Sequence, residues 1–260
     1  MLDFASRVRL AETGKTHLFF VGQAGFLIKS KSGQLLGLDL YLSDCVERVE
    51  AHVGYKRLLP RIVEPAELEI DCLIATHFHR DHFDIDAMPG LMENSRTHLF
   101  AAKDCEEDIA ELNIDTNRYT LVEPGDHDVC GDFTLDFINC DHGTGAPKAV
   151  GVIVEVDEKR FLFVGDTCLR LDHKDEYLQK GKIDIMIAPI NGAYGNLDED
   201  ECVELAKELK PGITVPSHYG MFASHGGNPG KFYEGMKNCS EVGFELDFEL
   251  MGQGDSLTIE

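Results

Sequence analysis

Short apolar runs recur along the 260-residue chain, and most alternate with polar positions or are rich in β-branched residues. Such runs predict strands, because a half-buried strand exposes every second side chain and a fully buried strand is apolar throughout. The predicted strands are 17–22, 25–30, 34–40, 71–76, 97–101, 132–138, 149–156, 160–165, 184–188, 213–216, 244–250 and 256–259.

Helical segments follow the early strands. Apolar residues at helical spacing predict helices over 84–93, 103–112, 172–180, 199–209 and 229–240. Asp198 and Asn228 precede the last two segments and are expected to cap them, with Pro229 suited to a first helical turn. Hairpins followed by strands that alternate with helices predict an α+β fold, with two mixed sheets face to face and helices outside. Periodicity alone leaves other layered α/β folds open.

Composition narrows the class of protein. A chain with 43% apolar residues suits one domain over 1–260. The 24 basic against 47 acidic residues argue against a nucleic-acid partner, which requires a basic surface. No apolar run is long enough for a membrane span, and residues 1–4 lack the layout of a secretion signal, so we expect a cytoplasmic protein. The eight cysteines form no C-x-x-C pair and are expected to be mostly buried thiols.

The segment 70–84 carries the candidate chemistry. Its apolar strand ends abruptly in His77, His79, Asp81 and His82. Three imidazoles and a carboxylate within six residues are hard to explain as core, because each buried polar group needs its own partner. Imidazole and carboxylate together suit zinc, iron or manganese.

Three later apolar strands also end in a residue of ligand type. These residues are His142, Asp166 and His218. Each would be weak evidence alone, since single residues of this kind usually serve turns or buried hydrogen bonds. Four such strand ends in one chain together predict a metal site.

The ordered set resembles the signature of the metallo-β-lactamase superfamily, with Asp39 matching the aspartate of its first motif. A closer likeness is to the L-ascorbate-6-phosphate lactonase family. The segments that carry this likeness are 21–30, 57–60, 75–77, 192–196 and 216–222. His142 departs from those lactonases, which have an aspartate–arginine pair nearby, and favours a two-metal site.

The resemblance implies an αββα sandwich with the metal site at one edge of the sheets. It implies one ion held by His77, His79 and His142, and a second held by Asp81, His82 and His218. Asp166 would bridge the two ions, and Asp39 would support the histidine loop by hydrogen bonds. The expected cofactor is one or two divalent ions, Mn²⁺ or Zn²⁺, with iron also accepted by such ligands.

The expected function is hydrolysis of a small anionic substrate by a metal-activated hydroxide, with a phosphorylated sugar lactone as the leading candidate. Asp81 and His218 would be catalytic. Substrate contacts are expected from Asn191, Tyr194, Tyr219, Phe222 and His225. The cations nearest to the predicted site are Arg80, Arg170 and Lys231. They are candidates to meet an anionic group, but the sequence favours an ordinary surface charge for each.

Other functions stay open on the sequence alone. One is a phosphodiesterase for a cyclic-nucleotide-like or phospholipid substrate. Another is a non-catalytic metal-binding protein, although all seven ligand residues are present. A di-iron redox protein typically has glutamate in place of the second histidine, where this chain has His79. The role of Cys168 is open, and so is assembly into a homo-oligomer.

Overall fold

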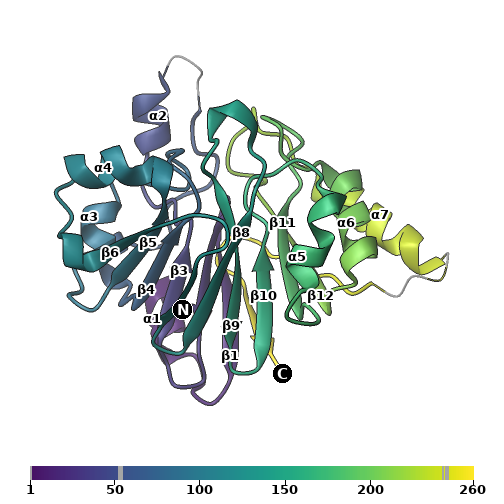
Figure 1. Ribbon diagram of the computed structural model, residues 1–260, viewed down its shortest axis with the longest axis horizontal. Coiled ribbons are helices and arrows are strands. Elements are labelled where there is room, and N and C mark those ends of the chain that lie inside the picture. The colour runs from purple at the N-terminus through teal and green to yellow at the C-terminus, as the bar shows by residue number, and fades with distance from the viewer. Residues whose placement is uncertain (1, 52–54, 242, 244–245) are drawn as a thin grey trace.

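Apolar strands pair into two sheets in a computed structural model that describes residues 2–51, 55–241, 243 and 246–260 (Figure 1). The first sheet has the order β13-β1-β2-β3-β4-β5-β6. Its strands are β1 (Thr16–Gly22), β2 (Gly25–Lys29), β3 (Leu35–Leu38), β4 (Cys72–Ala75), β5 (His98–Ala102), β6 (Tyr119–Val122) and β13 (Ser256–Ile259). Pairing is antiparallel from β13 to β3 and parallel from β3 to β6.

The second sheet has the order β12-β11-β10-β9-β8-β7. Its strands are β7 (His127–Cys130), β8 (Phe133–Asn139), β9 (Val150–Val156), β10 (Lys159–Phe163), β11 (Ile185–Pro189) and β12 (Ile213–Ser217). Strands β7 to β10 pair antiparallel, and β10, β11 and β12 pair parallel. Both sheets are therefore mixed, as the sequence predicted.

Helices cover the outer faces of both sheets, with α3 and α4 beside the first sheet and α5, α6 and α7 beside the second (Figure 1). The α-helices are α1 (Phe4–Leu10), α2 (Cys45–Val49), α3 (Met88–Leu91), α4 (Glu106–Glu111), α5 (Lys174–Leu178), α6 (Glu199–Leu209) and α7 (Pro229–Glu241). Short 3₁₀ turns occur at 65–67, 103–105, 116–118, 143–145 and 171–173. None of the described helices is long and apolar enough to cross a membrane.

Three apolar layers hold the architecture together. Strand β1 shows why, because Leu18 and Phe20 point into the layer between the sheets while Phe19 and Val21 pack under the helices of the first sheet. Across the middle layer, the rings of Phe26 and Phe163 lie 6.0 Å apart, centroid to centroid. A third layer packs α6 and α7 on the second sheet. The predicted αββα sandwich is confirmed.

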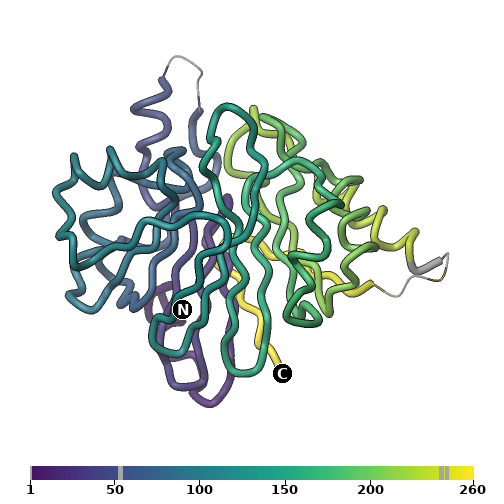
Figure 2. Tube along the Cα trace, viewed as in Figure 1, coloured from purple at the N-terminus to yellow at the C-terminus, as the bar shows by residue number. Residues whose placement is uncertain are grey.

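Some predicted elements differ from the structure. The strand predicted over 244–250 is wrong for 246–250, where Phe248 forms only an isolated bridge with Thr214, and 244–245 lie outside the described residues. The pattern missed α1, α2, β6 and β7. Strand β7 is an edge strand with exposed and half-buried positions, so it has no apolar run to detect. The chain ends beside its beginning, because β13 pairs with β1 (Figure 2).

Candidate metal centre

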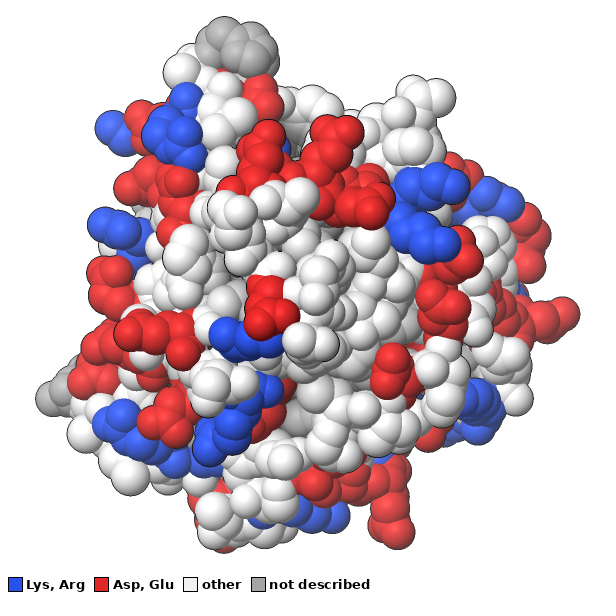
Figure 3. Space-filling view, turned by 60° about the vertical axis from the view of Figure 1, so that its left-hand side comes forward, with Lys and Arg blue, Asp and Glu red and all other residues white. Residues whose placement is uncertain are grey.

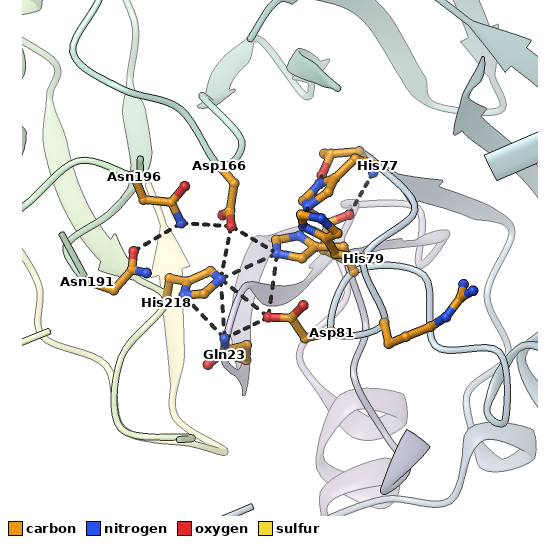
Figure 4. A network of polar contacts seen from close by, with 12 residues as sticks. Gln23, His77, His79, Asp81, Asp166, Asn191, Asn196 and His218 are labelled. Carbon is orange, nitrogen blue, oxygen red and sulfur yellow. Dashed lines mark hydrogen bonds and ion pairs between the residues drawn. The ribbon is translucent and has the colours of Figure 1, made fainter. Parts of the chain in front are cut away.

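The ends of strands from both sheets bring the seven predicted ligand residues together, and Figure 4 shows most of them around one point. Strand β4 leads into the loop with His77, His79, Asp81 and His82. The second sheet supplies the other residues, because His142 follows β8, Asp166 follows β10 and His218 follows β12. Facing sheets therefore provide the two halves of the site.

A first donor group consists of His77, His79 and His142, whose ligand atoms lie within 4.8 Å of one another. His79 Nδ1 lies 2.9 Å from His77 Nε2 and 3.2 Å from His142 Nε2. A neutral imidazole has one N–H and one lone pair, so three converging ring nitrogens cannot all be satisfied by hydrogen bonds to one another. This arrangement fits a cation among the nitrogens.

A second donor group consists of Asp81, His82 and His218, again within 4.8 Å. The Nε2 atoms of His82 and His218 are 3.4 Å apart. Asp81 Oδ2 lies 3.4 Å from His218 Nε2 and 3.8 Å from His82 Nε2. Two imidazoles and one carboxylate are ligands that a divalent transition metal accepts.

Asp166 lies between the two groups. Its Oδ2 atom is 3.1 Å from His218 Nε2 and 3.3 Å from His82 Nε2. Asp166 also forms a compact set of donors with His77 and His82, which joins the first group to the second. The carboxylate is thus in the place where a bridge between two ions would be needed.

Asp39 holds the histidine loop by three hydrogen bonds. Its carboxylate accepts from the Thr76 backbone amide at 2.8 Å and from the Thr76 hydroxyl at 2.7 Å. The third partner is His82 Nδ1 at 2.8 Å, which leaves Nε2 directed at the second donor group. These contacts are the ones expected for Asp39.

Two side-chain amides support the acidic ligands, and sequence reasoning missed both roles. Gln23 Nε2 donates to Asp81 Oδ2 at 2.8 Å, and Asn196 Nδ2 donates to Asp166 Oδ2 at 2.7 Å (Figure 4). Asn196 also donates to Asn191 Oδ1 at 3.1 Å. Both amides lie in segments that carried the family likeness, 21–30 and 192–196, which was the available signal.

Without a bound ion, the side chains of the two donor groups differ in their charge. Burial lowers the pKa of His77 well below its ordinary value and that of His79 to about 4, so both rings are neutral. Burial alone would raise the pKa of Asp81 and Asp166, but His82 and His218 outweigh it and hold both carboxyls ionised. Burial alone would lower the pKa of His82 and His218, but the nearby carboxylates, Asp166 first among them, outweigh it and raise both, that of His218 to about 9. A cation at the second group would therefore displace protons from these two rings, whereas the first group already presents lone pairs.

Backbone strain gathers at this site. The non-glycine residues Gln23, Asp39 and His218 have left-handed φ angles of 56°, 47° and 61°. Such conformations cost free energy and are held by the surrounding structure, often at functional sites. Two of these residues, Gln23 and His218, are joined by a backbone hydrogen bond, in which the His218 amide donates to the Gln23 carbonyl at 2.7 Å. This bond accompanies an antiparallel bridge between Gln23 and Tyr219.

A family model described as the beta-lactamase superfamily domain matches residues 17–218. The chain belongs to this family. The match spans all seven ligand-type residues and confirms the superfamily that the sequence resembled.

Relatives of this β-lactamase superfamily protein are similar over most of its length. A UPF0173 metal-dependent hydrolase of Anaeromyxobacter sp. (strain K) is 24% identical over 250 residues, which cover 89% of this chain and 85% of the relative. The probable L-ascorbate-6-phosphate lactonase UlaG of Escherichia fergusonii is 21% identical over 276 residues, covering 89% and 78%. A solved structure, the metallo hydrolase Igni18 of Ignicoccus hospitalis, has a TM-score of 0.75 at 19% identity and covers 95% of this chain and 99% of that chain.

A cavity of about 560 Å³ opens onto the donor groups of this β-lactamase superfamily protein. Of the predicted substrate contacts, Tyr194 and His225 line it. Asn191 does not line it and accepts a hydrogen bond from Asn196. The Tyr219 hydroxyl donates to the Met251 carbonyl at 2.7 Å, and Phe222 is buried against Tyr41.

Three of the predicted contacts, Asn191, Tyr219 and Phe222, therefore lie outside the cavity wall. Phe222 is 2% exposed because its apolar ring packs into the core, whereas Tyr219 is half-buried and packs against the layer between the sheets. Cys168 belongs to none of the three donor sets found among the described residues.

The three candidate cations for an anionic substrate all have carboxylate partners. Arg80 Nη1 lies 2.6 Å from Asp108, and Arg170 pairs with Asp141 and Asp172. Lys231 pairs with Glu199 and Asp200. The described cations in these positions are thus already neutralised.

Proposed function

We propose that this protein is a metal-dependent hydrolase that uses two divalent transition-metal ions, Mn²⁺ or Zn²⁺. The observation that carries the proposal is the pair of donor groups on a shared cavity, with Asp166 between them. His77, His79 and His142 would hold one ion. Asp81, His82 and His218 would hold the second. The curated relatives described as metal-dependent hydrolases support the same activity.

A divalent ion in such a site supplies a nucleophile near neutral pH, since it lowers the pKa of a coordinated water to about 7, and it polarises the substrate oxygen. The residues of the chain do the positioning. Asp81 lines the cavity, and Gln23 fixes one of its oxygens at 2.8 Å. An ionised carboxylate held in this way can orient an attacking water molecule and accept its proton.

His218 also lines the cavity, and its place is fixed from both sides. Its backbone amide donates to the carbonyl of Gln23, which lies between β1 and β2 of the first sheet. Its Nε2 atom lies 3.1 Å from Asp166 Oδ2, which follows β10 of the second sheet. The residue therefore keeps a set orientation toward the reacting bond. We assign Asp81 and His218 the catalytic roles for these reasons.

Within this activity we propose an ester-type bond, with lactones first among small substrates. Similarity to the probable lactonase of Escherichia fergusonii supports this choice. No serine or cysteine of the described cavity wall is available as a nucleophile, which favours direct attack by water over a covalent enzyme intermediate.

Elemental analysis of protein purified without chelator tests the proposal. We expect up to two transition-metal ions per chain, a clear loss of metal in Asp166→Ala, and no loss in the matched control Asp172→Ala, whose carboxylate is exposed. Hydrolysis is then measured on a panel of lactones and on bis-p-nitrophenyl phosphate.

Three outcomes would count against the proposal. A wild type that takes up no metal would overturn the site, and unchanged metal content in Asp166→Ala would remove the bridge. A metal-loaded protein inert toward every ester and phosphoester would instead be a metal-binding protein without catalysis.

A further inference from the structure

Apolar and aromatic side chains form the outer wall of the cavity. This outer wall consists of Val46, Val49, Tyr55, Phe78, Tyr194 and His225. Val46 is buried, whereas Val49 and Tyr194 are 39% and 57% exposed. The outer wall thus reaches from the depth of the cavity to its mouth, beyond the metal donors.

Tyr55 and Tyr194 form a pair across the mouth. Their hydroxyl oxygens are 2.5 Å apart, and their rings meet edge to face with centroids 6.2 Å apart. His225 packs against both rings, at 5.0 and 5.1 Å between centroids, and stacks on His218 at 5.4 Å. An aromatic surface therefore leads from the mouth directly to the proposed metal ligand.

The tyrosine pair offers an uncharged surface. Burial and the bond to Tyr194 raise the pKa of the Tyr55 hydroxyl, so it stays protonated at neutral pH. Each hydroxyl of the pair has the other as a partner. Both tyrosines line the cavity, and covering their ring surface with an apolar group gains free energy.

Apart from the proposed metal ions, the described wall offers an anionic substrate little positive charge. Apart from the metal donors, its charged residues are Glu50 and Arg80. Arg80, the cation of the pair, is held by Asp108 at 2.6 Å, and both side chains are largely buried. The Gly143 amide, a candidate donor to a phosphate, is bonded to Asp141 at 3.3 Å. The view in Figure 3 shows basic side chains only in small groups among acidic ones.

We propose that the substrate is uncharged and carries an apolar group, seated on the Tyr55–Tyr194 pair while the reacting bond lies at the metal donors. This inference rests on the proposed function and replaces the phosphorylated sugar expected from sequence with a neutral, apolar-substituted ester or lactone. Because Arg80 is already paired with Asp108, a phosphate would gain no new ion pair with it, and the outer wall selects for the apolar group.

Three six-membered lactones separate charge from apolarity. They are δ-decanolactone, glucono-δ-lactone and the 6-phosphate of glucono-δ-lactone, each offered to the metal-loaded enzyme. We expect kcat/KM for δ-decanolactone to exceed that for glucono-δ-lactone by about tenfold or more, as burial of an apolar chain implies. The phosphorylated lactone should be the poorest substrate. A preference for it would overturn the inference.

Variants of the outer wall sharpen the test. Tyr55→Ala and Tyr194→Ala should each lower kcat/KM for δ-decanolactone about tenfold and leave that for glucono-δ-lactone nearly unchanged. Tyr233→Ala is the matched control, because Tyr233 is 41% exposed on α7 and lies outside the cavity wall. Val49→Lys adds a cation at the mouth and should improve the phosphorylated lactone about fivefold. Equal losses for both neutral lactones would contradict a specific seat for the apolar group.

Binding without turnover distinguishes this inference from the proposed function. The lactam analogue of δ-decanolactone resists hydrolysis, and calorimetry measures its affinity for the metal-loaded protein. Tight binding of the lactam that weakens about tenfold in Tyr55→Ala supports the apolar seat, whether or not any lactone is hydrolysed. If such binding is found but no lactone is hydrolysed, only the proposed function fails. Failure of the lactam to bind, with hydrolysis of polar lactones intact, overturns the inference alone.

Discussion

At the residue scale, neutral amides hold the two buried carboxylates of the candidate metal centre. Gln23 and Asn196 each donate one hydrogen bond to a buried carboxylate, at 2.8 and 2.7 Å. An amide adds no charge, so the carboxylates keep their attraction for a cation while their orientation is set. Partners of this kind tune metal affinity without touching the ion.

Gln23→Leu keeps the size of the side chain and removes the donor to Asp81. We expect metal affinity to fall roughly 10- to 100-fold, as for other residues that orient ligands, because Asp81 becomes free to rotate. Competition with a chromophoric chelator measures this affinity. Gln179→Leu, at an exposed position after α5, is the control and should leave the affinity unchanged. Equal affinity in Gln23→Leu and wild type would refute the positioning role.

Asp39→Asn tests the support of the histidine loop. The carboxylate is 1% exposed and accepts three hydrogen bonds, and an amide nitrogen in its place cannot accept from Thr76 or His82. The free energy of unfolding should fall by about 3 kcal/mol. Urea denaturation of the metal-free proteins measures it. Asp44→Asn, exposed and without a side-chain cap bond, should change it by less than about 0.5 kcal/mol.

At the element scale, α6 fixes the loop that carries Asn196. Asp198 accepts from the Glu201 amide at 2.9 Å, and the Glu201 carboxylate accepts from the Asp198 amide at 3.0 Å. The N-cap of this capping box, Asp198, lies two residues after Asn196. The apolar face of α6, including Cys202 and Leu205, then docks on the second sheet.

Asp198→Ala removes one half of that capping box. Since a lost cap leaves a helix amide without its partner, the free energy of unfolding should fall by about 1 kcal/mol. Urea denaturation followed by circular dichroism measures the change. Glu204→Ala, at an exposed interior position of the same helix, should stay within about 0.5 kcal/mol of wild type. A similar loss in both variants would show that general helix propensity, rather than the cap, is responsible.

At the scale of the whole molecule, the donor groups join the two sheets. In each donor group, residues that follow β4 of the first sheet face a histidine that follows a strand of the second sheet. This histidine is His142 in the first group and His218 in the second. An ion held by such a group would bind the folded chain far better than the unfolded chain, because unfolding separates its ligands.

Removal of metal should therefore destabilise the fold. At a free metal concentration 100 times the dissociation constant, binding at one site adds about 2.7 kcal/mol to the free energy of unfolding. Thermal unfolding with chelator, and again after metal is restored, measures the difference. Chelator already saturated with metal is the control and should have no effect. An unfolding temperature that is the same with and without chelator would show that the ions do not link the sheets.

The sequence by itself predicted the candidate ligand residues that the structure brings together. Each of His142, Asp166 and His218 ends an apolar strand, and that local pattern is readable because burial and β propensity act over a few neighbouring residues. Strand alternation likewise predicted the two mixed sheets. Edge strand β7 escaped prediction since its neighbours, rather than its own residues, make it a strand.

Only the tertiary structure decided how these residues meet and what surrounds them. Gln23 reaches Asp81 across 58 positions of sequence, and Tyr55 reaches Tyr194 across 139, distances at which no local pattern operates. The same long-range packing paired Arg80 with Asp108, so this candidate for meeting an anionic group already has a carboxylate partner. Register between strands and packing between sheets set such contacts, and both depend on the whole chain.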